Sequence, residues 1–145
     1  MIRAFMRNIF QTPPEVFGSG AAISARVALV VDDEAELKRA IGKFLVQNGF
    51  TVHYADNGAE ALDALKKIQG GVSVIVTDHD MPRMTGSELM EAVRAEQASV
   101  GIMVGISSNP RGRNLFLAAG AHLVFDKPFV ASTIINSILE ALQKP

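Results

Sequence analysis

Five short apolar runs alternate with five helix-like patterns between residues 26 and 143 of the chain. The runs are largely continuous and rich in β-branched residues, which is typical of strands buried on both faces of a parallel sheet. The segments between them repeat apolar residues at three- and four-residue spacing, which predicts helices with one buried face. We expect strands at 26–31, 50–54, 72–77, 101–106 and 122–125, and helices at 34–47, 58–69, 87–97, 113–119 and 130–143. This order predicts a doubly wound α/β sandwich around a five-stranded parallel sheet, with right-handed crossovers.

Residues 1–25 follow a different pattern from the rest of the chain. The first ten residues place apolar side chains at helical spacing, and Pro13, Pro14 and the 18–20 Gly-Ser-Gly stretch come after them. A helix this short is marginal alone in water, so we favour a flexible leader, or residues upstream of the true start, over an amphipathic docking helix. We do not expect this segment to contact a membrane. The predicted domain division is therefore a 1–25 extension and one domain at 26–145.

Composition narrows the chemistry without naming a function. The chain has 145 residues, 14 Lys and Arg against 15 Asp and Glu, and no cysteine. Near-neutral charge argues against nucleic-acid binding through bulk electrostatics, and we expect no direct contact with nucleic acid. The lack of cysteine excludes disulfides, thiol catalysis and Cys-ligated metals. The sequence holds no apolar stretch of the roughly 20 residues needed to span a bilayer.

Polar side chains follow four of the five predicted strands. In an open α/β sheet, ligands bind outside the carboxyl ends of the strands, so we expect these side chains to converge on one edge. They are Asp32, Asp33 and Glu34 after the first strand, Asp78 and Asp80 after the third, Ser107 after the fourth, and Lys127 after the fifth.

Each of these residues also has a purely structural interpretation. Asp32 or Asp33 could cap the first helix, and Asp33 with Glu36 fits a capping box; Asp78 could start a turn. Together they are better explained by a site, because clustered carboxylates repel one another unless a cation neutralises them. Mg²⁺ is the natural occupant of a cluster of oxygen ligands. Carboxylates, Mg²⁺, a lysine and a hydroxyl indicate phosphoryl transfer.

Four motifs in this order resemble the receiver domain of bacterial two-component response regulators. They are VVDDE at 30–34, TDHDMPRMTG at 77–86, ISS at 106–108 and DKPF at 126–129, and ADNGAEAL at 55–62 is similar to the start of that family's second helix. The resemblance covers about residues 26–143. It implies the flavodoxin-like (βα)5 fold with strand order 2-1-3-4-5.

The resemblance also implies roles for the acidic residues. Asp78 matches the phosphoacceptor, whose carboxylate takes a phosphoryl group from a phosphohistidine. Asp33 matches the direct Mg²⁺ ligand, and Asp32 matches its neighbour that acts through water. Asp80 stands where the family supplies a backbone carbonyl to the metal.

The remaining matches concern the phosphoryl group and the neighbouring loops. Ser107 matches the hydroxyl residue and Lys127 the lysine that bind phosphoryl oxygens. The Lys127–Pro128 bond is typically cis in the family, and Pro82 and Gly86 match the loop after the acceptor.

The resemblance implies a signalling module rather than an enzyme with a separate substrate. It would catalyse only its own phosphorylation and dephosphorylation. Its expected partners are a sensor histidine kinase or phosphotransfer protein and an unidentified downstream protein, with a possible phosphorylation-linked homodimer. The expected location is the cytoplasm.

The sequence departs from the family pattern at a few positions. The family usually has an aromatic residue three positions before the lysine, and here that residue is Val124, so the usual aromatic rotamer switch is absent. Phe125 is adjacent but should face the other side of its strand. The extra Asp80 carboxylate could hold a water near the acyl phosphate, tune its lifetime or simply face solvent. Ser108 could narrow access to the phosphoryl group, and Asn109 lies where its hydrolysis could be influenced.

Two alternatives remain open on the sequence alone. Asp78-His79-Asp80 also resembles the DxD motif of haloacid-dehalogenase-type phosphatases, with the first aspartate as nucleophile and the second as acid/base. The Val124 departure instead fits a receiver-like scaffold that acts without phosphorylation. His53, His79 and His122 lack metal-ligand spacing and are interpreted as ordinary polar or core residues.

Overall fold

A computed structural model describes residues 26–144 and shows five parallel strands with five helices. The strands are β2 (Arg26–Val31), β3 (Phe50–Ala55), β4 (Val72–Asp78), β5 (Val100–Ser107) and β6 (Leu123–Asp126), and the helices are α1 (Ala35–Gln47), α2 (Gly58–Lys67), α3 (Gly86–Ala95), α4 (Pro110–Ala118) and α5 (Ala131–Gln143). The sheet order is β3-β2-β4-β5-β6. Counted from β2, this is the predicted order 2-1-3-4-5, so the predicted fold is confirmed. The predicted extension at residues 1–25 lies outside the described residues.

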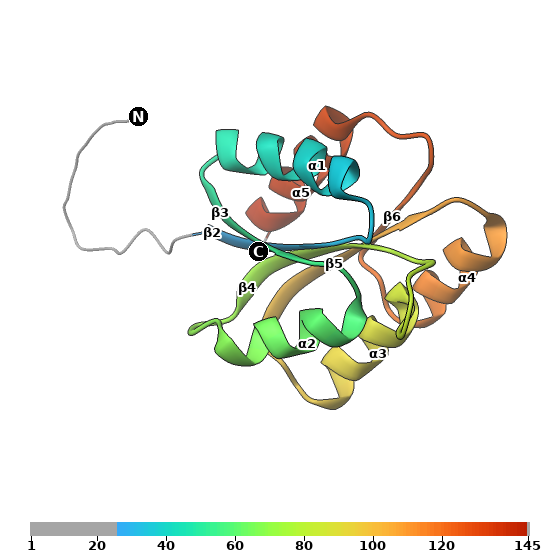
Figure 1. The fold of residues 1–145 in the computed structure, drawn as a ribbon. Helices are drawn as coiled ribbons and strands as arrows, with labels where there is room; N and C mark the ends of the chain where they lie inside the picture. Colours follow the sequence, from blue (N-terminus) through green and yellow to red (C-terminus); the bar gives the residue numbers. More distant parts are fainter. Residues whose placement is uncertain (1–25, 145) are drawn as a thin grey trace, which may run out of the picture.

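Helices cover both faces of the sheet, with α1 and α5 on one face and α2, α3 and α4 on the other (Figure 1). Strand residues alternate between these layers. In β2, Leu29 and Val31 pack into the α2–α4 side, whereas Ala28 and Val30 pack into the α1–α5 side. Since both faces are buried, the strand sequences are continuous apolar runs rather than alternating ones.

Side-chain caps start three of the helices. Asn57 accepts a hydrogen bond from the Glu60 N–H at the start of α2, and Thr85 with Glu88 forms a capping box at α3. Asn109 caps α4 by accepting from the Gly112 N–H at 2.8 Å. This cap and Pro110 in the first turn start α4 at residue 110, three residues before the predicted start, because proline suits the first helical position. Arg111 therefore lies within α4.

Helix α1 begins without a side-chain cap. Its N-cap residue is Glu34, which makes no side-chain cap hydrogen bond. The Asp33–Glu36 capping box considered as an alternative is therefore wrong, and the Asp33 carboxylate is left exposed at the end of β2.

Candidate functional site

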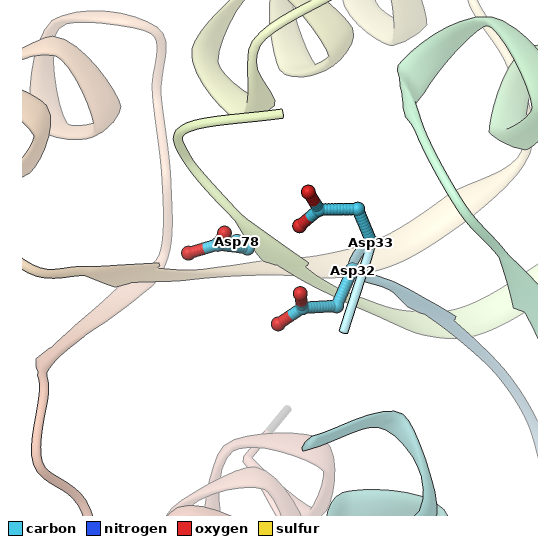
Figure 2. A group of neighbouring side chains, drawn as sticks. All are labelled: Asp32, Asp33 and Asp78. Carbon is cyan, nitrogen blue, oxygen red and sulfur yellow. The ribbon is translucent and has the colours of Figure 1, made fainter. Parts of the chain in front are cut away.

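Three carboxylates meet at the carboxyl ends of β2 and β4. One oxygen from each of Asp32, Asp33 and Asp78 lies within 4.8 Å of the others. Strands β2 and β4 are paired neighbours, so residues that directly follow β2 lie beside the last residue of β4 (Figure 2). The predicted convergence of these residues is confirmed. This donor set consists only of carboxylate oxygens, which fits a hard divalent cation such as Mg²⁺.

The three carboxylates differ in exposure. Asp32 is 3% exposed and Asp78 is 7% exposed, whereas Asp33 is open to solvent. Asp32 Oδ1 accepts a hydrogen bond from the Glu34 N–H at 2.8 Å, which fixes its side chain beneath the cluster. Asp33 could therefore offer a cation an accessible oxygen, and Asp32 a buried one.

Lys127 brings a positive charge to this cluster. Its Nζ lies 3.0 Å from Asp78 Oδ1 and 3.9 Å from Glu34 Oε1. Burial lowers the pKa of Lys127, but the hydrogen bond and charge of Asp78, with Asp32 and Glu34, outweigh burial and raise it. The lysine therefore keeps its positive charge beside Asp78. The Lys127–Pro128 peptide bond is cis, as the family resemblance implies.

Burial makes two of the acids reluctant to ionise. It raises the pKa of Asp32 from 3.8 to about 6, and the negative charge of Asp78 adds to this effect, while the Glu34 N–H opposes it. Burial also raises the pKa of Asp78, although Lys127 pulls in the opposite direction. Lys127 thus offsets only part of the cost of holding negative charge on these acids. A bound cation would favour the ionised form of all three acids.

Ser107 lies at the end of β5 with its hydroxyl turned toward α4. It is fully buried, and its Oγ donates to the Asn109 carbonyl at 2.7 Å and accepts from the Asn109 N–H at 3.2 Å. The main-chain N–H of Lys127 donates to the Ser107 carbonyl at 2.8 Å, which ties the hydroxyl residue to the lysine-bearing loop.

His79 packs beside the site, and the sequence interpretation did not identify its contacts with Asp80 and Ser87. The Asp80 carboxylate is largely exposed and accepts from His79 Nδ1 at 3.0 Å and from Asn109 Nδ2 at 3.5 Å. His79 is buried, and its Nε2 lies 3.0 Å from Ser87 Oγ. A signal was available, because the strand alternation that turns Ile75 toward α2–α4 also turns residue 79 to that side.

Val124 and Phe125 lie on β6, where the family usually has an aromatic residue at position 124. Val124 pairs with Gly105 and packs on the α2–α4 side, whereas Phe125 packs on the α1–α5 side. The prediction that these side chains face opposite ways is confirmed. Phe116 of α4 lies over Gly105, since a Cβ added there would fall 2.5 Å from its ring.

Comparison with known proteins agrees with this arrangement. Residues 28–139 match the family model described as the response regulator receiver domain. The chain belongs to this family. That membership decides against the haloacid-dehalogenase alternative.

Individual relatives support the same assignment. The chain is 33% identical over 118 residues to a chemotaxis protein CheY homolog of Campylobacter jejuni, covering 79% of this chain and 90% of that protein. It is 32% identical over 124 residues to the sensor kinase CckA of Brucella abortus, covering 83% of this chain but only 13% of the kinase. The structure of the chemotaxis response regulator CheY4 of Vibrio cholerae matches with a TM-score of 0.72 and 28% identity, covering 81% of this chain and 99% of that one.

Receiver domains of response regulators are signalling domains of two-component systems, controlled by phosphorylation and generally not enzymes with a separate substrate. They bind Mg²⁺ at an acidic pocket, and the cluster of Asp32, Asp33 and Asp78 could hold such an ion. Within residues 26–144, no helix combines the length and apolarity needed to cross a membrane.

Proposed function

We propose that this receiver domain, residues 26–145, accepts a phosphoryl group on Asp78 in a Mg²⁺-dependent reaction and then shifts a partner-binding face. The donor is a phosphohistidine of a sensor histidine kinase or phosphotransfer protein. One observation carries the proposal: three carboxylates within 4.8 Å of one another share a strand edge with Lys127, whose Nζ is 3.0 Å from Asp78 Oδ1.

Charge balance explains why an anionic donor can approach these acids. Three carboxylates bring about three negative charges, and a divalent cation with Lys127 restores about three positive ones. Asp33 and Asp78 would ligate the ion directly, Asp32 through water, and Asp80 through its backbone carbonyl. Bound Mg²⁺ supplies charge neutralisation on the phosphoryl oxygens.

The chain's own residues perform the transfer. An oxygen of Asp78 attacks the phosphorus, the P–N bond of the phosphohistidine breaks, and the imidazole nitrogen keeps the electron pair and takes a proton. The product is an acyl phosphate on Asp78. Lys127 stays beside it and pairs with one phosphoryl oxygen, and Ser107 turns its hydroxyl from Asn109 to another.

The new charge is the signal. Movement of Ser107 and Lys127 biases the loop and helix after β5 between two packings, and this changes the face that a downstream protein or a second copy binds. We place this exchange in the cytoplasm, where sensor kinases present their phosphohistidine.

Intact-mass measurement with Mg²⁺ and acetyl phosphate tests the proposal. We expect one phosphoryl adduct on the wild type, none on Asp78→Asn, and none on the wild type in EDTA. Asp63→Asn removes an exposed acid on α2 and serves as the matched control, which keeps the adduct.

Two results would contradict the proposal. One is a folded wild type that takes no phosphoryl group from acetyl phosphate or from any histidine kinase, which would favour a scaffold that acts without phosphorylation. The other is an adduct that persists in Asp78→Asn.

A further inference from the structure

The ring of His79 lies between the phosphoacceptor loop and two helices. It follows Asp78 directly and is 6% exposed. Its Nε2 lies 3.0 Å from Ser87 Oγ in the first turn of α3, and its Nδ1 donates to the Asp80 carboxylate, which can only accept. Its main-chain N–H donates to the Ile106 carbonyl on β5 at 3.2 Å. Hydrogen bonds therefore tie His79 both to the acceptor loop and to the first turn of α3.

The remaining contacts of this ring are with α4. Phe116 packs against it edge to face, with ring centroids 5.1 Å apart at 82°. Gly112 approaches it so closely that an added Cβ would lie 3.3 Å from the imidazole. Gly112 and Phe116 are the buried residues of α4, so both buried positions of this helix touch His79.

Ser107 is the second support of α4 at the site. A Cβ on Gly112 would lie 2.5 Å from Ser107 Oγ, and this hydroxyl also holds Asn109, the cap residue of α4. If Ser107 turns toward a phosphoryl group, these contacts with Asn109 are lost. The His79 ring then still touches α4, and besides it the acceptor loop reaches this helix through the exposed Asp80 carboxylate, 3.5 Å from the Asn109 amide.

The usual aromatic route is not available to this chain. Val124 occupies the position on β6, and Phe116 from α4 itself covers the neighbouring Gly105. A displacement of the acceptor loop reaches Phe116 through the His79 ring, since the two rings are in direct contact.

We propose that His79 is the positioning residue that transmits phosphorylation of Asp78 to α4, through the contacts of its ring with Gly112 and Phe116. This inference rests on the proposed function. In this chain the signal would pass from the end of β4 directly to α4. In the family pattern an aromatic side chain on β6 rotates instead.

The test separates phosphorylation from its transmission. NMR records the change in the amide chemical shifts of residues 110–118 when Mg²⁺ and beryllofluoride, a stable phosphoryl mimic, are added. Intact mass after acetyl phosphate treatment records acceptance by the same proteins. The variants are His79→Ala and His79→Leu, which lack the flat ring, and His79→Phe, which keeps it. His53→Ala, on the edge strand β3, is the control.

We expect all variants to form the adduct. The α4 response should fall about fivefold in His79→Ala and His79→Leu, within the coupling energies typical of such networks, and persist in His79→Phe and His53→Ala. If His79→Ala does not fold, the leucine and phenylalanine variants decide the question, because both keep the buried volume.

The outcomes that overturn the inference differ from those that overturn the proposed function. An undiminished α4 response in folded His79→Leu that carries the adduct would overturn the coupling role, as would its loss in His79→Phe. Absence of the adduct from the wild type would instead overturn the proposed function.

Discussion

Asp32 shows what the site costs the folded chain. A carboxylate that is 3% exposed gives up much of its hydration, and the negative Asp78 lies in the same cluster. The Glu34 N–H recovers only part of the loss, so the pKa of Asp32 rises to about 6. An acid kept at such a cost is better explained by binding than by stability.

The pH dependence of stability should expose this cost. The pKa of Asp32 is about 6 in the folded chain and has its ordinary value of 3.8 when the chain is unfolded. The folded state therefore holds more protons between those pH values, and this residue lowers the free energy of unfolding as pH rises through them. The shift corresponds to about 3 kcal/mol at pH 7.

Asp32→Asn keeps the acceptor oxygen for the Glu34 N–H and removes the charge. In EDTA, we expect it to be about 1–3 kcal/mol more stable than the wild type at pH 7, and equal to it below pH 4. Urea unfolding at several pH values measures this difference, with exposed Asp63→Asn as the control. If Asp32→Asn gained no stability over the wild type between pH 4 and pH 7, the raised pKa of Asp32 would be contradicted.

The sequence was sufficient to predict which residues meet at the site, but not the side-chain contacts that surround them. Strand ends share an edge in any parallel sheet, so the order of elements was sufficient to bring Asp33, Asp78 and Lys127 together. The environment of His79 depends on how α4 packs, and α4 is placed by contacts with Gly105 and Gly86 that no local pattern encodes.

At the scale of elements, the predicted bounds match the structure where a strand is a long apolar run. They differ from it where a capping residue determines the start of a helix. The strand Arg26–Val31 is as predicted, because its residues are buried on both faces. Helix α4 starts earlier than predicted, since Asn109 and Pro110 begin a helix that apolar spacing alone places at 113. The alternative interpretation of Asp33 as a helix cap is wrong, because a carboxylate at a strand end can serve a site instead of a helix.

Glycines at the starts of two helices give a matched test of packing. Gly86 begins α3 so close to the acceptor strand that an added Cβ would lie 2.2 Å from the Asp78 carbonyl oxygen. Gly58 begins α2, and an added Cβ would lie 2.7, 2.8 and 2.9 Å from the Cγ, Sδ and Cβ of Met84, with no backbone atom among its nearest neighbours.

We therefore expect Gly86→Ala to lower the free energy of unfolding by about 2 kcal/mol, since backbone cannot yield to the methyl group. Gly58→Ala should cost less, about 1 kcal/mol, because the Met84 Cγ and Sδ can rotate away, only its Cβ must shift with the loop, and alanine favours helix. Urea unfolding of both variants measures the contrast. Equal losses would show that the close approach of α3 to β4 is not what requires glycine at residue 86.

For the whole molecule, the sheet holds the acids together, and an ion that binds them should stabilise the fold. Helices cover both faces of the sheet whose strand ends carry the acids (Figure 1). The three carboxylates come from the ends of two paired strands, so they meet only in the folded chain. A ligand that binds the folded state alone raises its stability by mass action, about 1.4 kcal/mol at ten times Kd. For a domain of this size, that corresponds to a rise of about 3–5 °C in Tm.

Mg²⁺ should therefore raise the Tm of the wild type, and Asp33→Asn should abolish the rise. Asp33 is exposed, so its substitution removes a ligand with little direct effect on packing, and Asp63→Asn should keep the full response.

Because the pKa of Asp32 is about 6, the Mg²⁺-induced rise should shrink as pH falls below that value, when a proton competes with the ion. Differential scanning calorimetry at pH 5 and pH 8 measures both effects. A Tm that rises equally in the wild type and Asp33→Asn would place the ion elsewhere, and a rise that persists at pH 5 would separate ion binding from the ionisation of Asp32.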